Sequence, residues 1–522
     1  MTTLQLGNLN IIWPGGLLGW LGWFALLAVL FWGVRLVWTP GAFKNLRWGL
    51  LAAFIALTPF TTFLMVTQLS GSGIPLPNMP GVAAAPVLIT FFALPWVLAA
   101  GFLGAIPAAL VGLVSGTILA LWGTHNLFTP IEITGLALVF AMVIRQPYRT
   151  TFYRLLRQPL IAVLAVGLIF LPFYLLSSFF SVNGSIAVRM DYALTQSWLS
   201  FLARMGELLI AGIVAQILLL FPGLGWYRPA ALQPSPTEAS LSWRFFFSIM
   251  PLVIITALVL TLGDWWVAGS AARQMINGRM SSAADVAAKS LPYFLEAGQT
   301  LVQNYATSDL IPLSPQTQAD RLADQVQLSP YFRQMILIDS NSNILSGYPE
   351  SQVENIKLAP EELMAVQLAL QGVPIQTYAI PAYTQPADQN PISAQISFIS
   401  PIQSETGQMV GVLIGRTDLV SNPYTQPAIE AMQTIAAEGG EGMILDENQR
   451  VLYDTLQSPE LVMSSYIGQP QTEAAFFEDV SASGTRQLVY YQPGEGRPWA
   501  IVLTMPAEGA NQLALKIAIP LL

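Results

Sequence analysis

Few side chains in this sequence have the types and spacing that catalysis or metal binding requires. The chain has no cysteine and a single histidine, His125. Thiol nucleophiles, disulfides and Cys-ligated metals are therefore excluded, and His-based metal sites and Ser–His catalysis are disfavoured. The turn DSNSN (339–343) starts like a calcium loop, but Ile344 stands at the sixth position, where such loops need glycine. We also find no phosphate-binding Gly-rich loop and no nucleophile elbow, so we expect no catalytic site, metal or cofactor within these 522 residues.

Arg204 and Glu207 form an oppositely charged pair inside a long apolar stretch. Their i,i+3 spacing puts them on one face of a helix, where each can neutralise the other. Because ionisable residues at membrane depth are costly and often functional, two interpretations stay open. The pair is either a structural neutralisation or part of a relay for protons or ions.

Hydrophobic residues make up 53 % of the chain and charged residues 10 %, with a mean hydropathy of +0.54. This composition is typical of membrane proteins. Residues 1–268 hold eleven basic and five acidic residues, whereas residues 269–522 hold the other eleven basic and 25 acidic ones. We infer two different bodies joined near residue 268. The second body is acidic and would repel nucleic acid and anionic lipid.

Apolar runs long enough to cross a bilayer, about 20 residues each, predict eight membrane spans. They cover 16–38, 47–69, 81–100, 102–122, 130–145, 160–181, 199–221 and 245–267. With eight spans, the basic segments 39–47, 145–158 and 222–244 fall on one side, which the positive-inside rule makes cytoplasmic. The N-terminus and the acidic half then lie outside the cytoplasm, and Trp265 and Trp266 mark the outer end of the last span.

After the last span, a helical period gives way to a strand period. Residues 269–306 repeat apolar side chains at helical spacing, which predicts a stalk helix packed on its own domain or on a second copy. MILIDSNSNILSGYP (335–349) then alternates as strand, polar turn and strand. Its Asp339 corresponds to Asp446 in GEGMILDENQRVLYDT (440–455), 107 residues later. Because each hairpin is followed by a longer strand pair, we predict two copies of one α+β module.

Two strings resemble a known family when they are taken with the stalk and the tandem modules: ISPIQSETGQMVGVLIG (399–415) and YYQPGEGRPWAIVLTMP (490–506). The pattern over about 270–508 resembles the double Cache sensor, the PAS-like extracellular region of bacterial chemoreceptors, sensor kinases and cyclases. More loosely, the eight-span bundle resembles the multi-span sensory regions that precede bacterial signalling modules. The resemblance implies a mixed fold, in which an α-helical polytopic bundle precedes an extracytoplasmic α+β tandem sensor.

The resemblance also implies a ligand pocket in the membrane-distal module. In the amino-acid-binding branch of the family, an Arg-x-Trp-Tyr motif precedes the ISPI strand and an Asp follows the GVLIG strand. This sequence departs at both places, since Arg416 stands at the Asp position and Asp418 is displaced. The implied pocket residues are Tyr378, Tyr383, Gln395, Ser397 and Arg416. Arg416 would suit a carboxylate or other anionic ligand, unless it is a surface strand residue in a degenerate pocket.

We therefore predict a transmembrane bundle at 1–268, a stalk helix at 269–306, membrane-distal and membrane-proximal modules at 307–425 and 426–508, and the start of a ninth transmembrane helix at 509–522. The expected function is the small-molecule input portion of a homodimeric bacterial inner-membrane receptor. Its output chemistry (a kinase, cyclase, phosphatase or methyl-accepting region) would lie beyond these residues. The alternative is a transporter or channel with an external regulatory domain, in which Arg204 and Glu207 face a polar cavity at the membrane midplane.

Overall fold

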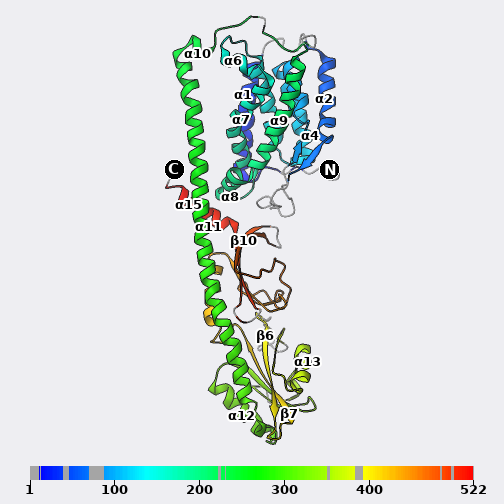
Figure 1. The fold of residues 1–522 in the computed structure, drawn as a ribbon, viewed down its shortest axis with the longest axis vertical. Coiled ribbons are helices and arrows are strands. Elements are labelled where there is room, and N and C mark those ends of the chain that lie inside the picture. Colours follow the sequence, from blue (N-terminus) through cyan, green and yellow to red (C-terminus); the bar gives the residue numbers. More distant parts are fainter. Residues whose placement is uncertain are drawn as a thin grey trace. The chain divides into compact units, whose positions relative to one another are not determined.

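The computed structural model describes residues 11, 13–38, 46–69, 87–221, 225–229, 231–349, 353–381, 392–481, 485–494, 496 and 499–520. Contacts within the chain divide it into two compact units, each considered by itself. The helical unit comprises Met1–Ala271, Ser483–Thr485 and Asn511–Leu522, and the sheet unit comprises Ala272–Ala482 and Arg486–Ala510. In Figure 1 the helical unit is drawn mainly from blue to green, and the sheet unit from green to red.

The helical unit consists of apolar helices packed around a shared core. Its elements are α1 (Gly16–Val37), α2 (Trp48–Phe63), β1 (Val66–Gln68), β2 (Val87–Ile89), α3 (Leu94–Phe102), α4 (Ala105–Leu119), α5 (Thr129–Arg145), α6 (Thr151–Leu156), α7 (Pro159–Ser181), α8 (Ile186–Asp191), α9 (Trp198–Leu219) and α10 (Pro236–Ala239), with π-helical turns at Ala120–Thr124 and Tyr192–Gln196. α11 (Leu241–Tyr305) begins in this unit and ends in the sheet unit.

Two glycines allow α4 and α5 to pack closely. A Cβ atom at Gly112 would lie 2.8 Å from the Cβ of Ala137, and one at Gly116 would lie 2.9 Å from the Cα of Pro130. Small residues four apart let helix backbones approach in this way. The small residues of the GLVSG segment (112–116) thus serve helix packing.

Five of the described helices are long and apolar enough to cross a membrane: Gly16–Val37, Ala105–Thr124, Pro159–Ser181, Trp198–Leu219 and Leu241–Tyr305. α2 and α5 are shorter, with 16 and 17 residues. The expected span at 81–100 is wrong in its described part, because residues 87–89 form a strand and α3 has only nine residues. At about 1.5 Å per residue, such a helix cannot cross a hydrocarbon core of about 30 Å. Because the deduced orientation depends on an even number of spans, the number of spans and the orientation both stay predictions.

The sheet unit contains two five-stranded antiparallel sheets. The first has the strand order β4-β3-β7-β6-β5, and the second, read from the same end, has the order β9-β8-β12-β11-β10. The elements are α12 (Pro315–Leu328), β3 (Gln334–Asp339), β4 (Ile344–Tyr348), α13 (Pro360–Ala369), β5 (Ile375–Ala379), β6 (Gln395–Gln403), β7 (Met409–Asp418), α14 (Gln426–Ala437), β8 (Glu441–Leu445), β9 (Val451–Asp454), β10 (Ala475–Val480), β11 (Arg486–Pro493) and β12 (Ala500–Pro506), with 3₁₀ turns at Ser308–Leu310 and Val353–Asn355. α15 (Ala507–Ala518) begins in the sheet unit and ends in the helical unit.

The 107-residue repeat is present in the hairpin of each sheet. The carboxylate of Asp339 accepts hydrogen bonds from the backbone N–H groups two and four residues later, at 2.8 and 2.7 Å. Asp446 accepts the equivalent bonds at 2.8 and 2.8 Å. Ser342 and Gln449, also 107 residues apart, have left-handed backbones with φ of 67° and 60°. The two aspartates therefore build equivalent turns, as predicted.

The apolar stripe on the second half of α11 is buried within the sheet unit itself. Its buried members include Met280, Ala287, Leu291, Leu295 and Val302. Phe294 of the same stripe stacks on Tyr331, with ring centroids 5.4 Å apart, and meets the edge of Phe398 of β6 at 5.9 Å. Of the two alternatives for this stripe, burial on its own domain is therefore the one found.

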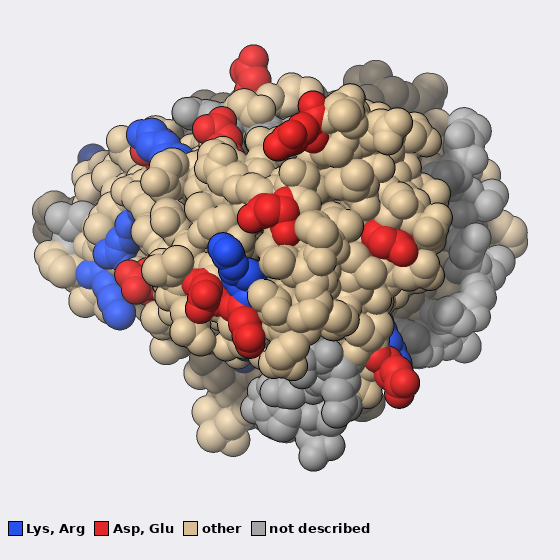
Figure 2. All heavy atoms as spheres, turned by 90° about the horizontal axis from the view of Figure 1, so that it is seen from below, with Lys and Arg blue, Asp and Glu red and all other residues tan. Residues whose placement is uncertain are grey.

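Charged side chains are dispersed over the surface. On the face shown in Figure 2, acidic side chains are scattered among uncharged residues. Ion pairs in the sheet unit such as Arg279–Glu438 and Lys289–Asp285, both 2.7 Å long, are exposed. Because solvent screens exposed pairs, they contribute little to stability. The charged groups with the largest energetic consequences are the buried ones.

Candidate functional site

A row of polar side chains crosses the first sheet. In the strand register, Gln334 of β3 faces Arg416 of β7, Arg416 faces Ser397 of β6, and Ser397 faces Thr377 of β5. Directly opposed residues project to the same side of a sheet, so the four side chains share one face. The residue two positions along each strand is an isoleucine that packs with the apolar side of α13. This face of the first sheet therefore has an apolar row of side chains packed under α13 and, next to that row, a polar one.

Arg416 is buried and is held by Glu362 of α13. Its Nε and Nη2 atoms donate to the two carboxylate oxygens of Glu362 at 2.8 and 2.5 Å, and the two side chains are 3 % and 0 % exposed. Nη1 donates to Gln334 at 2.8 Å, and Nη2 also donates to the carbonyl oxygen of Lys357 at 2.8 Å. The interpretation of Arg416 as a surface residue is therefore wrong. A ligand carboxylate would meet a guanidinium group already bound to an internal carboxylate.

Gln395 and Ser397 complete the hydrogen bonding of Glu362. Oε1 of Glu362 accepts from Gln395 Nε2 at 3.0 Å and from Ser397 Oγ at 2.5 Å, and Oε2 accepts from the backbone N–H of Ala359 at 2.8 Å. Glu362 occupies the third position of α13, where a carboxylate can reach back to the start of the helix. The structure thus gathers three predicted residues, Gln395, Ser397 and Arg416, around one that sequence reasoning missed. The available signal was that a buried arginine needs a carboxylate, which the PEEL segment offers.

Tyr378 lies apart from this polar cluster. It follows Thr377 on β5 and so projects to the opposite face of the sheet. There its hydroxyl accepts a hydrogen bond of 3.1 Å from the indole Nε1 of Trp499, the residue before β12 of the second sheet. The role of Tyr378 as a pocket residue stays a prediction, and Tyr383 lies outside the described residues.

The segment that leads into β6 is tied to the second sheet. The backbone N–H of Ala394 donates to the carbonyl oxygen of Leu452 at 2.7 Å, and Ser393 forms an antiparallel bridge with Tyr453. β6 also carries Gln395 and Ser397 of the polar cluster. The backbone of residues 393–395 therefore connects the polar cluster directly to the second sheet.

In the helical unit, the predicted pair Arg204–Glu207 is present. Nη1 of Arg204 donates to Oε2 of Glu207 at 2.7 Å, and the other carboxylate oxygen accepts from the backbone N–H of Ile89 in β2 at 2.9 Å. A backbone N–H group buried among apolar side chains needs such a partner, because no water reaches it there. The pair thus stabilises the β1–β2 strand pair as well as neutralising itself.

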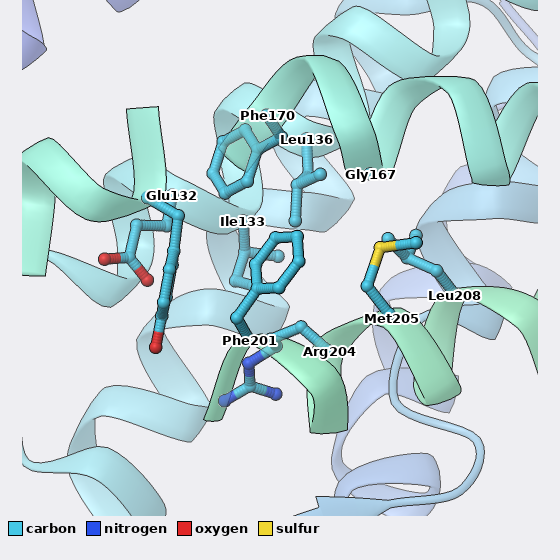
Figure 3. A pocket seen from close by; sticks show the side chains of 10 residues that line it. Glu132, Ile133, Leu136, Gly167, Phe170, Phe201, Arg204, Met205 and Leu208 are labelled. Carbon is cyan, nitrogen blue, oxygen red and sulfur yellow. The ribbon is translucent and has the colours of Figure 1, made fainter. Parts of the chain in front are cut away.

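A small cavity lies beside this pair, between α5, α7 and α9. Figure 3 shows Glu132, Phe170, Phe201 and Arg204 among the side chains that line it. Its volume is about 10 Å³, which is room for about one water molecule. Oε1 of Glu132, a residue that sequence reasoning did not single out, lies 2.5 Å from the hydroxyl oxygen of Ser177. The cavity is too small for a transported solute in this conformation.

No family model and no curated protein matches this sequence. Solved structures resemble part of it. The ligand-binding domain of the Pseudomonas fluorescens chemoreceptor CtaA in complex with L-serine is 21 % identical, with a TM-score of 0.34, and the match covers 45 % of this chain and 99 % of that one. The ligand-binding domain of the Pseudomonas aeruginosa chemoreceptor PctB with L-Arg is 19 % identical, with a TM-score of 0.34. That match covers 45 % of this chain and 97 % of that one. The sensor domain of the V. cholerae histidine kinase DctB is 12 % identical, with a TM-score of 0.33. That match covers 45 % of this chain and 98 % of that one.

Proposed function

We propose that this chain is the input portion of a bacterial transmembrane receptor. The sheet unit is then an extracytoplasmic tandem PAS-like sensor of the double Cache type, and the helical unit is its anchor in the inner membrane. The observation that carries this proposal is the buried polar cluster of Glu362, Arg416, Ser397 and Gln395 on the first sheet. Burying charges costs several kcal/mol, so a fully hydrogen-bonded charged cluster in a sheet core suggests a recognition site more than simple packing.

The ligand that fits this cluster is a small molecule with a carboxylate group. Guanidinium groups bind carboxylates through two parallel hydrogen bonds, and Glu362 makes this contact with Arg416 in the present structure. A ligand carboxylate would take over donors of Arg416 and release Glu362 together with the start of α13. The proposed contacts of this carboxylate are Gln395, Ser397 and Arg416 together with Tyr383, whereas Tyr378 projects to the opposite face of the sheet and is not proposed to touch it.

Transmission would begin at β6. Ser397 lies in the polar cluster, and the next residue, Phe398, projects to the other face, where its ring meets Phe294 of α11. α11 is the helix whose earlier residues belong to the helical unit. A shift of Ser397 would therefore move an aromatic contact on the helix that enters the membrane bundle.

The first experiment tests the ligand class. The full chain, in lipid nanodiscs, is titrated calorimetrically with a panel of mono- and dicarboxylates and amino acids. Arg416→Met should abolish binding, whereas Glu362→Gln should strengthen it, because the internal competitor loses its charge. Asp285→Asn, in an exposed ion pair on α11, is the matched control and should bind like the wild type. Unchanged binding by Arg416→Met would refute the proposed site.

We also propose that the chain forms a homodimer through α11. Met275, Val286 and Tyr293 of α11 are 47 %, 44 % and 62 % exposed. Their spacings of eleven and seven residues keep them on one side of the helix. Tyr293 contacts Tyr424 of the sheet unit, with ring centroids 5.6 Å apart, but all three side chains stay well exposed, so a second copy of the chain is the proposed partner.

The dimer is tested by crosslinking in native membranes. Because the sequence lacks cysteine, Val286→Cys introduces a single thiol into the chain. Mild oxidation should yield a disulfide-linked dimer with Val286→Cys and much less with Gln274→Cys, which is exposed on another side of α11. Equal crosslinking of the two variants, or none, would contradict a dimer through this stripe.

A further inference from the structure

Glu132 is a buried carboxyl group in the helical unit, as are Asp191 and Glu207. It is 8 % exposed, and its Oε1 lies 2.5 Å from the hydroxyl oxygen of Ser177 on α7. The titratable side chains on its own element and on the elements around it are Arg35, His125, Arg145, Tyr174, Asp191, Tyr192, Arg204 and Glu207. Among these, Arg204, Tyr174 and Tyr192 are close enough to Glu132 to interact with it electrostatically.

The positive charge near Glu132 is already neutralised. Arg204 makes its ion pair of 2.7 Å with Glu207, whose second oxygen holds the backbone of Ile89. If Glu132 and Glu207 were both ionised, the cluster would carry a net charge of −1 in the interior of an apolar bundle. One hydroxyl group cannot offset the desolvation of a buried carboxylate, so the neutral acid is the favoured form of Glu132.

The hydrogen bonds around Ser177 lead to the same conclusion. Its hydroxyl oxygen lies 2.5 Å from Oε1 of Glu132 and 2.9 Å from the carbonyl oxygen of Tyr174. A serine hydroxyl carries one hydrogen, so it can donate to only one of these two acceptors. Both contacts become hydrogen bonds only when Glu132 is protonated and donates to Ser177, while Ser177 donates to Tyr174.

The cavity beside Glu132 limits what can bind there. Glu132 and Arg204 both line it (Figure 3), and its volume of about 10 Å³ admits about one water molecule. A water molecule can deliver a proton, but a larger ligand does not fit. We propose that Glu132 is a proton-binding site, which gives the helical unit an input of its own. On protonation, Glu132 gains one proton and donates it in a hydrogen bond to Ser177, the hydroxyl hydrogen of Ser177 turns to the carbonyl oxygen of Tyr174, and the cluster becomes neutral.

This proposal does not rest on the ligand site of the sheet unit. It is tested by infrared difference spectroscopy of the full chain in nanodiscs, titrated with pH. The wild type should show the carbonyl stretch of a protonated, buried carboxylic acid at low pH, and this band should fade as the pH rises. Glu132→Gln, which keeps a hydrogen-bond partner for Ser177, should lose the band. Glu207→Gln frees the charge of Arg204, so it should keep the band at low pH but move the pH midpoint of its titration downward.

A second variant separates proton binding from a general loss of structure. Ser177→Ala removes the hydroxyl group that bonds Glu132 but leaves the carboxyl group in place. It should keep the carboxylic acid band, shift its frequency and move the pH midpoint of its titration. The proposal is overturned if Glu132→Gln leaves the band unchanged, or if the wild type shows no titrating band over the pH range in which it stays folded.

Discussion

The indole Nε1 of Trp499 donates a hydrogen bond of 3.1 Å to the hydroxyl of Tyr378, and this contact joins the two sheets of the sheet unit. The rings meet edge to face, with centroids 5.5 Å apart. Both residues are buried, with Tyr378 6 % and Trp499 2 % exposed. Tyr378 lies on β5, the neighbour of β6, which carries part of the polar cluster. The second sheet is thus held one strand away from the candidate site.

We expect Trp499→Phe and Tyr378→Phe to show mutual dependence. Either change removes the hydrogen bond but preserves an aromatic ring, so the packing is mostly kept. The coupling free energy in a double-mutant cycle should be about 0.5–1.5 kcal/mol, the net value of one buried hydrogen bond. It is measured by urea unfolding of the full chain in nanodiscs. Strictly additive effects would show that the contact does not couple the sheets.

Gly298 of α11 should not tolerate a side chain. A Cβ atom there would lie 2.4 Å from the hydroxyl oxygen of Tyr331 and 2.5 Å from the ring of Phe398. Gly298→Ala should therefore cost about 1–3 kcal/mol through overpacking. Gly278→Ala on the same helix meets nothing within 4 Å and should gain up to about 1 kcal/mol from helix propensity. Thermal unfolding of both variants compares them, and similar effects would contradict the packing described here.

Replacing only one partner of the buried pair Arg416–Glu362 should destabilise the first sheet. Arg416→Met leaves an unpaired carboxylate in the core and should destabilise the first sheet by about 3–5 kcal/mol. The double variant Arg416→Met with Glu362→Leu removes both charges and should recover most of this loss. Amide hydrogen exchange of β6 and β7 in the full chain reports the change locally. A double variant as unstable as the single one would mean that the pair itself is indispensable.

Asp454 of β9 should make the second sheet less stable as pH rises. The residue is 1 % exposed, and burial raises its pKa above the ordinary value of 3.8, although hydrogen bonds from Leu456 and Ser458 oppose the rise. Between the unfolded and folded pKa values the folded state binds more protons, so stability falls as pH rises through that window. Asp454→Asn should remove this slope and raise stability at neutral pH. Hydrogen exchange of β8 and β9 at several pH values measures it.

Asp339 serves as a control, because its pKa is shifted in the opposite direction to that of Asp454. Although burial acts to raise its pKa, hydrogen bonds from Asn343 and Asn341 lower it below the ordinary value. Its contribution to stability is therefore present above the unfolded pKa and is lost as pH falls through the folded pKa. Asp339→Asn should lower stability at neutral pH and leave it unchanged in strong acid. Parallel slopes for the Asp454 and Asp339 variants would contradict both assignments.

The features that sequence reasoning predicted well are local ones. The turns at Asp339 and Asp446 are built by a carboxylate that bonds backbone groups within four residues, so the pattern is complete in a short string. The expected span at 81–100 failed for a related reason. Hydropathy records that the segment is apolar, but a strand and a short helix buried among other helices are apolar as well.

By itself, the sequence determined the membrane character of the first half, the repeat of the second half and the i,i+3 pair of Arg204 with Glu207. Only the tertiary structure decided which groups meet across long stretches of chain. Glu362 reaches Arg416 over 54 residues, and Glu207 reaches Ile89 over 118. A charge or N–H group that is removed from water must find a hydrogen-bond partner among the groups that the fold places near it. Burial and tertiary packing therefore determine these pairs. Sequence spacing carries no record of that choice.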